Sequence, residues 1–213
     1  MCIRDRLDYV DIFYSHRPDP NTPLEETALA LDQLVRQGKA LYIGISNYDP
    51  QQTKTIKAIF DDLHTPYIVH QSRYSLFDQH IDRNGLLQTL MDEQTGLVTF
   101  SPLAQGLLTD RYLNGIPTDS RAHKSSSPFL HEDNVEHTLS TVKALNDLAQ
   151  QRCQSLAQMA IAWLLHQPVV SCVLVGASRP SQLQDNLKAF TNTDFSADEI
   201  NQINTLLAKM PQA

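Results

Sequence analysis

The chain has 213 residues, 41% of them hydrophobic and 19% charged, as is typical of a globular protein with one sizeable hydrophobic core. Its formal net charge of −7 argues against nucleic acid as a partner, because binding to phosphate backbones needs a basic surface. No apolar run approaches the ~20 residues of a membrane span, and no signal-peptide core follows the N-terminus, so we expect a cytoplasmic protein that does not insert into membranes.

Five apolar runs rich in β-branched and aromatic residues predict strands that are separated by helical segments. The predicted strands are residues 7–15, 40–45, 66–71, 96–100 and 170–175, the first of them buried. Residues 1–6 show no periodicity, and we expect them to be unstructured or foreign to the native sequence. Because strands and helices alternate along the chain, the sequence predicts an α/β fold with a parallel sheet, in a single domain over residues 1–213.

Proline and capping residues mark the beginnings of the predicted helices. Thr22 and Pro23 are expected to start the first helix, and Gly38 to end it. The other helices are expected from Asp49-Pro50, near Leu86–Glu93, at Val135–Arg152 and Ser155–His166, from Pro180, and at Ser196–Met210. Met159 and Trp163 lie on the apolar stripe of their helix, and we expect both in the hydrophobic core.

A stretch of about 30 residues between Pro102 and Asp133 is much longer than the usual connection of about 4–6 residues. It is locally basic within an acidic protein, through Arg111, Arg121, His123 and Lys124. Two interpretations are open, a solvated surface loop and a clamp over a phosphate-bearing ligand.

Polar or aromatic residues follow each of the five predicted strands. They are His16, Ser46 with Asn47, Gln71, Phe100 with Ser101, and Gly176 with Ser178. In parallel α/β architectures the carboxyl ends of the strands lie on one face, where ligands bind. The set supplies hydrogen-bonding groups for an amide or sugar, an aromatic ring for stacking and a corner for a phosphate. These groups suit a dinucleotide.

The segment from Gly176 to Asn186 predicts a strand end, a tight turn and a helix that begins at Pro180. Free backbone N–H groups and the positive end of the helix dipole favour an anion there. Ser178 and Arg179 stand beside that position, and a hydroxyl with a guanidinium matches a phosphate monoester. A plain turn before a capped helix explains the same residues without any ligand. The segment alone therefore does not decide between an anion site and a plain turn.

The spacing of the cysteines and histidines argues against a disulfide framework and against a metal site. The three cysteines have no regular pattern and are expected to be reduced thiols, and the eight histidines form no HExxH pair, which disfavours a metal site. No GxGxxG motif follows the first predicted strand, and a Rossmann fold is therefore disfavoured.

Four segments, in order and at matching spacing, resemble the sequential motifs of the aldo-keto reductases. They are LDYVDIFYSH at 7–16, GISN at 44–47, FSPLAQGLL at 100–108, and GASR at 176–179 with the residues that follow it. The resemblance covers about residues 7–210 and extends to the β subunits of voltage-gated potassium channels. It implies a (β/α)8 barrel that binds NADPH without a Rossmann domain, of which this chain would form a partial barrel, about strands 4 to 8.

The resemblance also implies a role for individual residues around NADPH. The residues expected at the nicotinamide are Ser46, Asn47 and Gln71 on the carboxamide and Phe100 stacked on the ring. Those expected along the pyrophosphate are Ser101, Leu103, Gln105 and Gly106, with Arg111 and Arg121 at basic lid positions. Those expected at the other end are Gly176, with Ser178 and Arg179 on the 2′-phosphate and Gln182, Asp185 and Asn186 around the adenosine.

His16 matches the catalytic histidine, which in this family helps to orient and polarise the substrate carbonyl. The alternative is a strand-end histidine bonded to a neighbour. Tyr14 and Tyr74 are expected to be packing residues, since neither matches the general acid of the family.

The part of the family fold that this chain resembles begins at the fourth strand of the family's barrel. The first three strands of the family carry its general-acid tyrosine, a lysine and an aspartate, so we expect residues 1–213 to be the C-terminal portion of a longer reductase. The expected activity is NADPH-dependent reduction of small aldehydes, of the glyceraldehyde 3-phosphate or methylglyoxal type. By itself the chain would lack the proton donor, which contributes roughly 10²–10⁴ in rate. The alternatives are an NADPH-binding regulatory subunit and a fragment without function. Homo-oligomerisation is compatible with the reductase and with the regulatory subunit.

Overall fold

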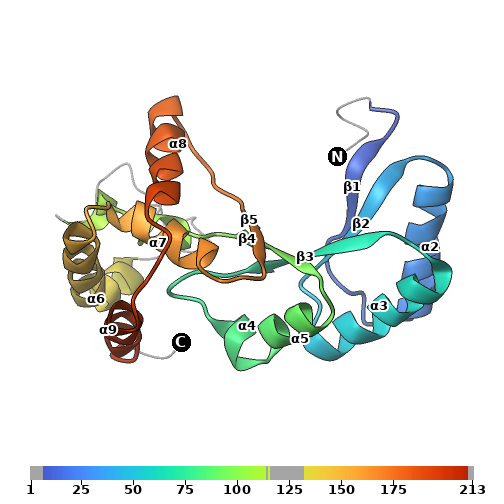
Figure 1. Cartoon of the computed structure of the whole chain (residues 1–213), viewed down its shortest axis with the longest axis horizontal. Coiled ribbons are helices and arrows are strands. Elements are labelled where there is room, and N and C mark those ends of the chain that lie inside the picture. Colours follow the sequence, from blue (N-terminus) through green and yellow to red (C-terminus); the bar gives the residue numbers. More distant parts are fainter. Residues whose placement is uncertain (1–6, 114, 116–131, 211–213) are drawn as a thin grey trace. The chain divides into compact units, whose positions relative to one another are not determined.

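Five strands form one sheet in the computed structural model, which describes residues 7–113, 115 and 132–210. The strands are β1 (Val10–Ser15), β2 (Ala40–Ser46), β3 (Tyr67–Arg73), β4 (Gly96–Phe100) and β5 (Val170–Val173). Their order in the sheet is the order of the sequence, and β1, β2 and β3 pair in parallel (Figure 1). The predicted α/β fold with a parallel sheet is therefore confirmed.

Helices connect the strands. They are α2 (Leu24–Arg36), α3 (Pro50–Leu63), α4 (His80–Arg83), α5 (Leu86–Asp92), α6 (Glu132–Gln151), α7 (Leu156–Leu165), α8 (Pro180–Leu187) and α9 (Ala197–Leu207). Short 3-10 helices accompany them in the described part of the chain: η1 (Ala104–Gly106), η2 (Asp110–Tyr112) and η3 (Lys188–Thr191). No helix in the described part of the chain combines the length and the apolar composition that a membrane crossing requires.

The chain divides into two compact units, which are described separately. The first unit contains the chain through Arg73, residues 79–98 and residues 169–172. Its core lies between the sheet and the helices α2 and α3, and is built from buried Ala28, Ile43, Ile45, Ile56 and Phe60 among others. Burial of these side chains stabilises the unit, since each isoleucine or phenylalanine side chain removed from water contributes about 1.5–3 kcal/mol.

The second unit contains residues 74–78, residues 99–168 and the chain from Val173 onward. Its central element is α7, in which eight of the ten residues are buried. Met159 and Trp163 are 0% and 4% exposed, and the indole packs 5.2 Å from the Tyr74 ring, so their prediction as core residues is confirmed. The capping boxes of α7 and α9 begin with Ser155 and Ser196, whose hydroxyls accept from backbone N–H groups three residues on.

The structure corrects the predicted elements in three places. The first helix has Pro23, not Thr22, at its N-cap, because the Thr22 hydroxyl donates to Asp19 (2.8 Å) instead of capping the helix. The short helix α4 was not predicted, since its four residues span barely one helical turn and show no period. The strand β1 is half-buried and not fully buried, and Leu7 and Tyr9, which precede it, are 58% and 53% exposed.

Candidate functional site

In the first unit, the carboxyl ends of β1, β2 and β3 are tied together around Asn47. The Asn47 side-chain amide donates to the His16 backbone carbonyl and to the Ser46 hydroxyl, at 3.0 Å in each case. Its backbone N–H donates to the Gln71 carbonyl at 3.1 Å. Asn47 has φ of 61°, a left-handed conformation that asparagine tolerates better than most residues. The structure therefore brings together all four residues of this unit that the sequence predicts at a site.

These four residues differ in exposure. The Ser46 side chain is buried, Gln71 is half-buried, and His16 and Asn47 are exposed. His16 is held through its main chain, and its imidazole has no hydrogen bond within the described residues. An imidazole in that situation can donate to or accept from a ligand at the strand ends.

A second layer of polar residues lies beneath these strand ends, and sequence analysis missed it. His70 is fully buried, with Nε2 3.2 Å from the Tyr48 carbonyl and Nδ1 3.2 Å from the Ser72 hydroxyl. The Tyr48 hydroxyl lies 2.8 Å from the Ser15 hydroxyl. Burial lowers the pKa of His70 to about 4, so this imidazole is neutral near pH 7. The available signal was the polar run His70-Gln-Ser72 at the end of a predicted strand.

In the second unit, the segment after β4 has an unusual backbone. Ser101, Ala104 and Gln105 have φ values of 57°, 46° and 59°, and Gly106 has 98°. Non-glycine residues rarely adopt such values, and strained backbone of this kind concentrates at functional sites. Phe100, which precedes the segment, is half-buried, and Leu103 packs against the α7 cluster of Ile161 and Ala162. The predicted pyrophosphate residues thus share one compact turn.

The basic lid is only partly within the described residues. Arg111 is exposed in η2, whose N-cap is Thr109. Arg121, His123 and Lys124 lie outside the described residues, so the choice between a surface loop and a clamp stays open.

The Gly176–Asn186 segment is the most open part of the candidate site. Gly176, Ser178 and Arg179 are exposed, and α8 begins at Pro180 as predicted. Within the described residues the Arg179 guanidinium has no carboxylate partner. The Ser178 backbone N–H donates to the Gln182 side chain (2.8 Å), which draws the turn back onto the first turn of α8.

Two further residues of α8 face different surroundings. The Asp185 carboxylate accepts from Gln158 (2.9 Å) and from Lys188 (3.2 Å). Asn186 is 8% exposed, and its side-chain amide makes no hydrogen bond within the described residues. Among the described residues the buried polar side-chain atoms without a partner are the hydroxyls of Tyr67 and Thr99, so the Asn186 amide reaches solvent and can bond to a ligand or to water.

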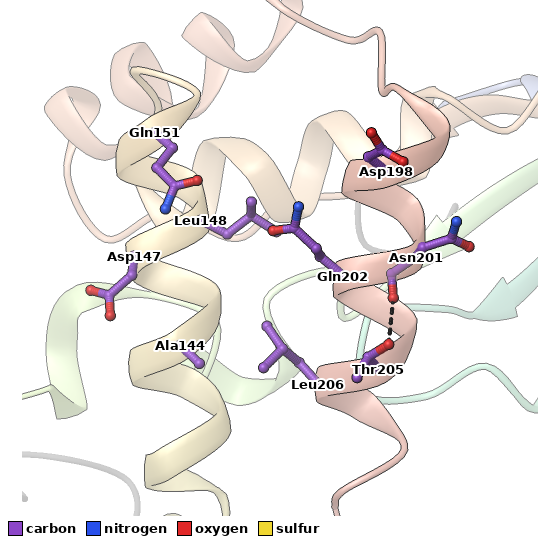
Figure 2. A pocket seen from close by; sticks show the side chains of 9 residues that line it. All are labelled: Ala144, Asp147, Leu148, Gln151, Asp198, Asn201, Gln202, Thr205 and Leu206. Atoms are coloured by element: carbon purple, nitrogen blue, oxygen red, sulfur yellow. Dashed lines mark hydrogen bonds between the residues drawn. The ribbon is translucent and has the colours of Figure 1, made fainter.

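A groove elsewhere in the second unit contains none of the predicted residues. It lies between α6 and α9 and is lined by Leu148, Leu206 and polar side chains such as Asp147 and Gln202 (Figure 2). The candidate site is therefore defined by strand ends and loops and not by this groove. No group of three or more metal-ligating side chains gathers in residues 7–113, 115 and 132–210.

Comparison with known proteins supports one family. The model of the aldo/keto reductase family matches residues 2–208. The L-glyceraldehyde 3-phosphate reductase of Escherichia coli O157:H7 is 48% identical over 205 residues, and a probable voltage-gated potassium channel subunit beta of Arabidopsis thaliana is 38% identical over 215. These matches cover 95% and 97% of this chain, but the chain spans only 59% and 65% of the two relatives.

Solved structures agree with the sequence relatives. The glycerol dehydrogenase of Gluconobacter oxydans superposes with a TM-score of 0.80 at 26% identity, over 98% of this chain and 62% of its own. A thermostable aldo-keto reductase in complex with the inhibitor epalrestat gives 0.72 at 29% identity, over 96% and 62%. The family match spans nearly the whole chain and agrees with these folds, and the protein therefore belongs to the aldo/keto reductase family.

Proposed function

We propose that this chain provides the NADPH-binding part of an enzyme that reduces small aldehydes to alcohols. The observation that carries the proposal is the family match over residues 2–208, together with the exposed Arg179 guanidinium, which has no carboxylate partner within the described residues. We further propose that the chain forms the fourth to eighth strand–helix repeats of a (β/α)8 barrel. The two compact units would then belong to one domain.

The residues at hand fit the cofactor in three respects. Arg179 is exposed without a carboxylate partner within the described residues, as a ligand of a 2′-phosphate should be. The Asn186 amide makes no hydrogen bond within the described residues and reaches solvent, so it can bond to an adenosine. The turn from Ser101 to Gly106 holds strained backbone where the pyrophosphate is expected.

NADPH, when bound, supplies a hydride to a carbonyl carbon. The residues of this chain would bind the cofactor and the substrate and orient them. Ser46, Asn47 and Gln71 would hold the nicotinamide carboxamide, and Phe100 would exclude water from one face of the ring. His16 would donate a hydrogen bond to the substrate carbonyl oxygen, where negative charge develops, and so stabilise the transition state. We assign no general acid to a residue of this chain.

The substrate class follows from the family and from the relative with 48% identity, whose name specifies L-glyceraldehyde 3-phosphate. We propose a small aldehyde of the glyceraldehyde 3-phosphate or methylglyoxal type. The second candidate function is a regulatory subunit that binds NADPH, which the 38% identity to the probable potassium channel subunit favours. Rapid turnover of methylglyoxal by the whole protein would support the enzyme, and tight NADPH binding without turnover would support the subunit.

Urea unfolding with and without NADPH tests cofactor binding directly. A ligand that binds only the folded state adds about 2.7 kcal/mol of stability at a concentration of 100 times its Kd. We expect one cooperative transition that moves to higher urea with NADPH and less with NADH, which lacks the 2′-phosphate. An NADPH-independent midpoint would refute the proposal. Absence of any cooperative transition would support a fragment without function of its own.

A further inference from the structure

We propose that His70 is a positioning residue that fixes the Asn47 turn for the nicotinamide end of the cofactor. This inference rests on the proposed function and extends it to a residue that touches no ligand. His70 is 0% exposed, so its imidazole acts only through the groups packed around it.

The hydrogen bonds of His70 determine which ring nitrogen carries the proton. The Tyr48 carbonyl, 3.2 Å from Nε2, can only accept, so Nε2 must carry the hydrogen. In the neutral ring Nδ1 is then an acceptor, and the Ser72 hydroxyl at 3.2 Å donates to it. Burial disfavours the charged imidazolium, and the tautomer with hydrogen on Nε2 is therefore kept.

Tyr48, the residue that His70 holds, directly follows Asn47 and is anchored at two places. Its carbonyl accepts from His70 in β3, and its hydroxyl bonds to Ser15 at the end of β1 (2.8 Å). Its side chain is almost fully buried, at 3% exposed. Tyr48 thus ties the turn after β2 to both neighbouring strands.

The Asn47 turn needs such an anchor because its conformation is not the preferred one. With φ of 61°, Asn47 occupies a sparsely populated region, and the surrounding structure must select it. Its side-chain bonds to His16 and Ser46 and its backbone bond to Gln71 all depend on that conformation. Loss of the His70 bond would leave the Tyr48 carbonyl buried without this partner and release the turn from one side.

Two ligands separate this positioning role from a general structural one. NADPH engages both ends of the proposed site, whereas 2′,5′-ADP carries only the adenosine and the 2′-phosphate. We expect His70→Leu to weaken NADPH binding about tenfold, as measured by calorimetry, because one buried hydrogen bond is lost. Binding of 2′,5′-ADP should stay within about twofold of the wild type, since its predicted residues lie elsewhere in the chain.

Two further variants keep the test decisive if His70→Leu does not fold. His70→Gln keeps an N–H donor for the Tyr48 carbonyl and should restore most of the NADPH affinity. Tyr48→Phe removes only the hydroxyl bond to Ser15 and should weaken NADPH, but not 2′,5′-ADP, about threefold. If each variant changes the affinity for both ligands equally, or changes neither affinity, the positioning role is wrong. A wild-type protein that binds neither ligand would instead overturn the proposed function itself.

Discussion

The strand ends of the first unit and the Gly176–Asn186 segment of the second show opposite ways of presenting polar groups. Around Asn47 the protein satisfies its own donors, with three hydrogen bonds from this residue and a buried layer at Tyr48 and His70. Around Arg179 most groups are exposed, and the main internal bond is the one from Ser178 to Gln182.

This difference separates residues that set geometry from residues that await a ligand. Substitution in the first region should lower the stability of the free protein, because internal contacts are lost. Substitution in the second region should leave the stability of the free protein unchanged or raise it slightly. It should also reduce the stabilisation that NADPH provides. The free energy of unfolding, measured with and without NADPH, therefore discriminates between the two regions.

The largest effect is expected for the pH dependence that His70 gives the first region. Its pKa is about 4 in the folded protein, against about 6.5 for an ordinary histidine. Between these values the unfolded chain binds the proton and the folded protein does not, so stability rises with pH. The stabilisation is fully present above pH 6.5 and lost as pH falls to 4, by about 3 kcal/mol in total.

Urea unfolding of the wild type and His70→Gln between pH 4 and 7.5 measures this contribution. The difference between the two proteins isolates His70, because carboxyl groups with lowered pKa, such as Asp32, lose their stabilising contribution at lower pH. Parallel pH profiles for the two proteins would show that His70 does not titrate as its burial requires.

The next largest effect is expected at Gly44, which lies opposite Tyr14 in the pairing of β1 with β2. A Cβ atom at Gly44 would lie 2.5 Å from Cε1 and 2.7 Å from Cδ1 of the Tyr14 ring. Gly44→Ala should therefore destabilise the protein by about 1–3 kcal/mol, as overpacking does. The double variant with Tyr14→Leu should recover part of that loss in urea unfolding.

Gly96→Ala is the matched control for this prediction. Its Cβ atom would come 2.5 Å from the Ser171 hydroxyl, which can rotate away, so the cost should be smaller than at Gly44. Equal losses at the two glycines would contradict the role given to the Tyr14 ring.

A smaller effect, of opposite sign, is expected at Asn186 in the second region. The residue is 8% exposed, but its amide reaches solvent and makes no hydrogen bond within the described residues, and leucine has a similar volume. Asn186→Leu should therefore stabilise the free protein by about 0.5 kcal/mol, since no buried hydrogen bond is lost and leucine has a higher helix propensity than asparagine in α8. The same variant should lose much of the stabilisation by NADPH. A loss of stability without ligand would show that the amide has a partner, such as bound water.

The sequence predicted which residues come together at the strand ends of the first region, but not the buried layer beneath them. His16, Ser46, Asn47 and Gln71 could be found because parallel strands end at one edge, so residues that follow strands come together. The bond from His70 to the Tyr48 carbonyl joins a side chain of β3 to the backbone of the turn after β2, and no local sequence pattern encodes that contact. Thr22 was misplaced as a cap for a similar reason, because its hydroxyl had a competing acceptor in Asp19.

The smallest effect on stability, and the sharpest on binding, is expected at Arg179. The side chain is exposed and makes no capping bond at the start of α8, so Arg179→Ala should change the free energy of unfolding by less than about 0.5 kcal/mol. Bonds from a guanidinium to a phosphate contribute about 1.5–3 kcal/mol, and NADPH should bind roughly 10- to 100-fold more weakly. Affinity for NADH, which has no 2′-phosphate, should not change in the same titrations. An equal loss for both cofactors would place Arg179 at another part of the ligand, and the open segment would no longer be the one that distinguishes the phosphate.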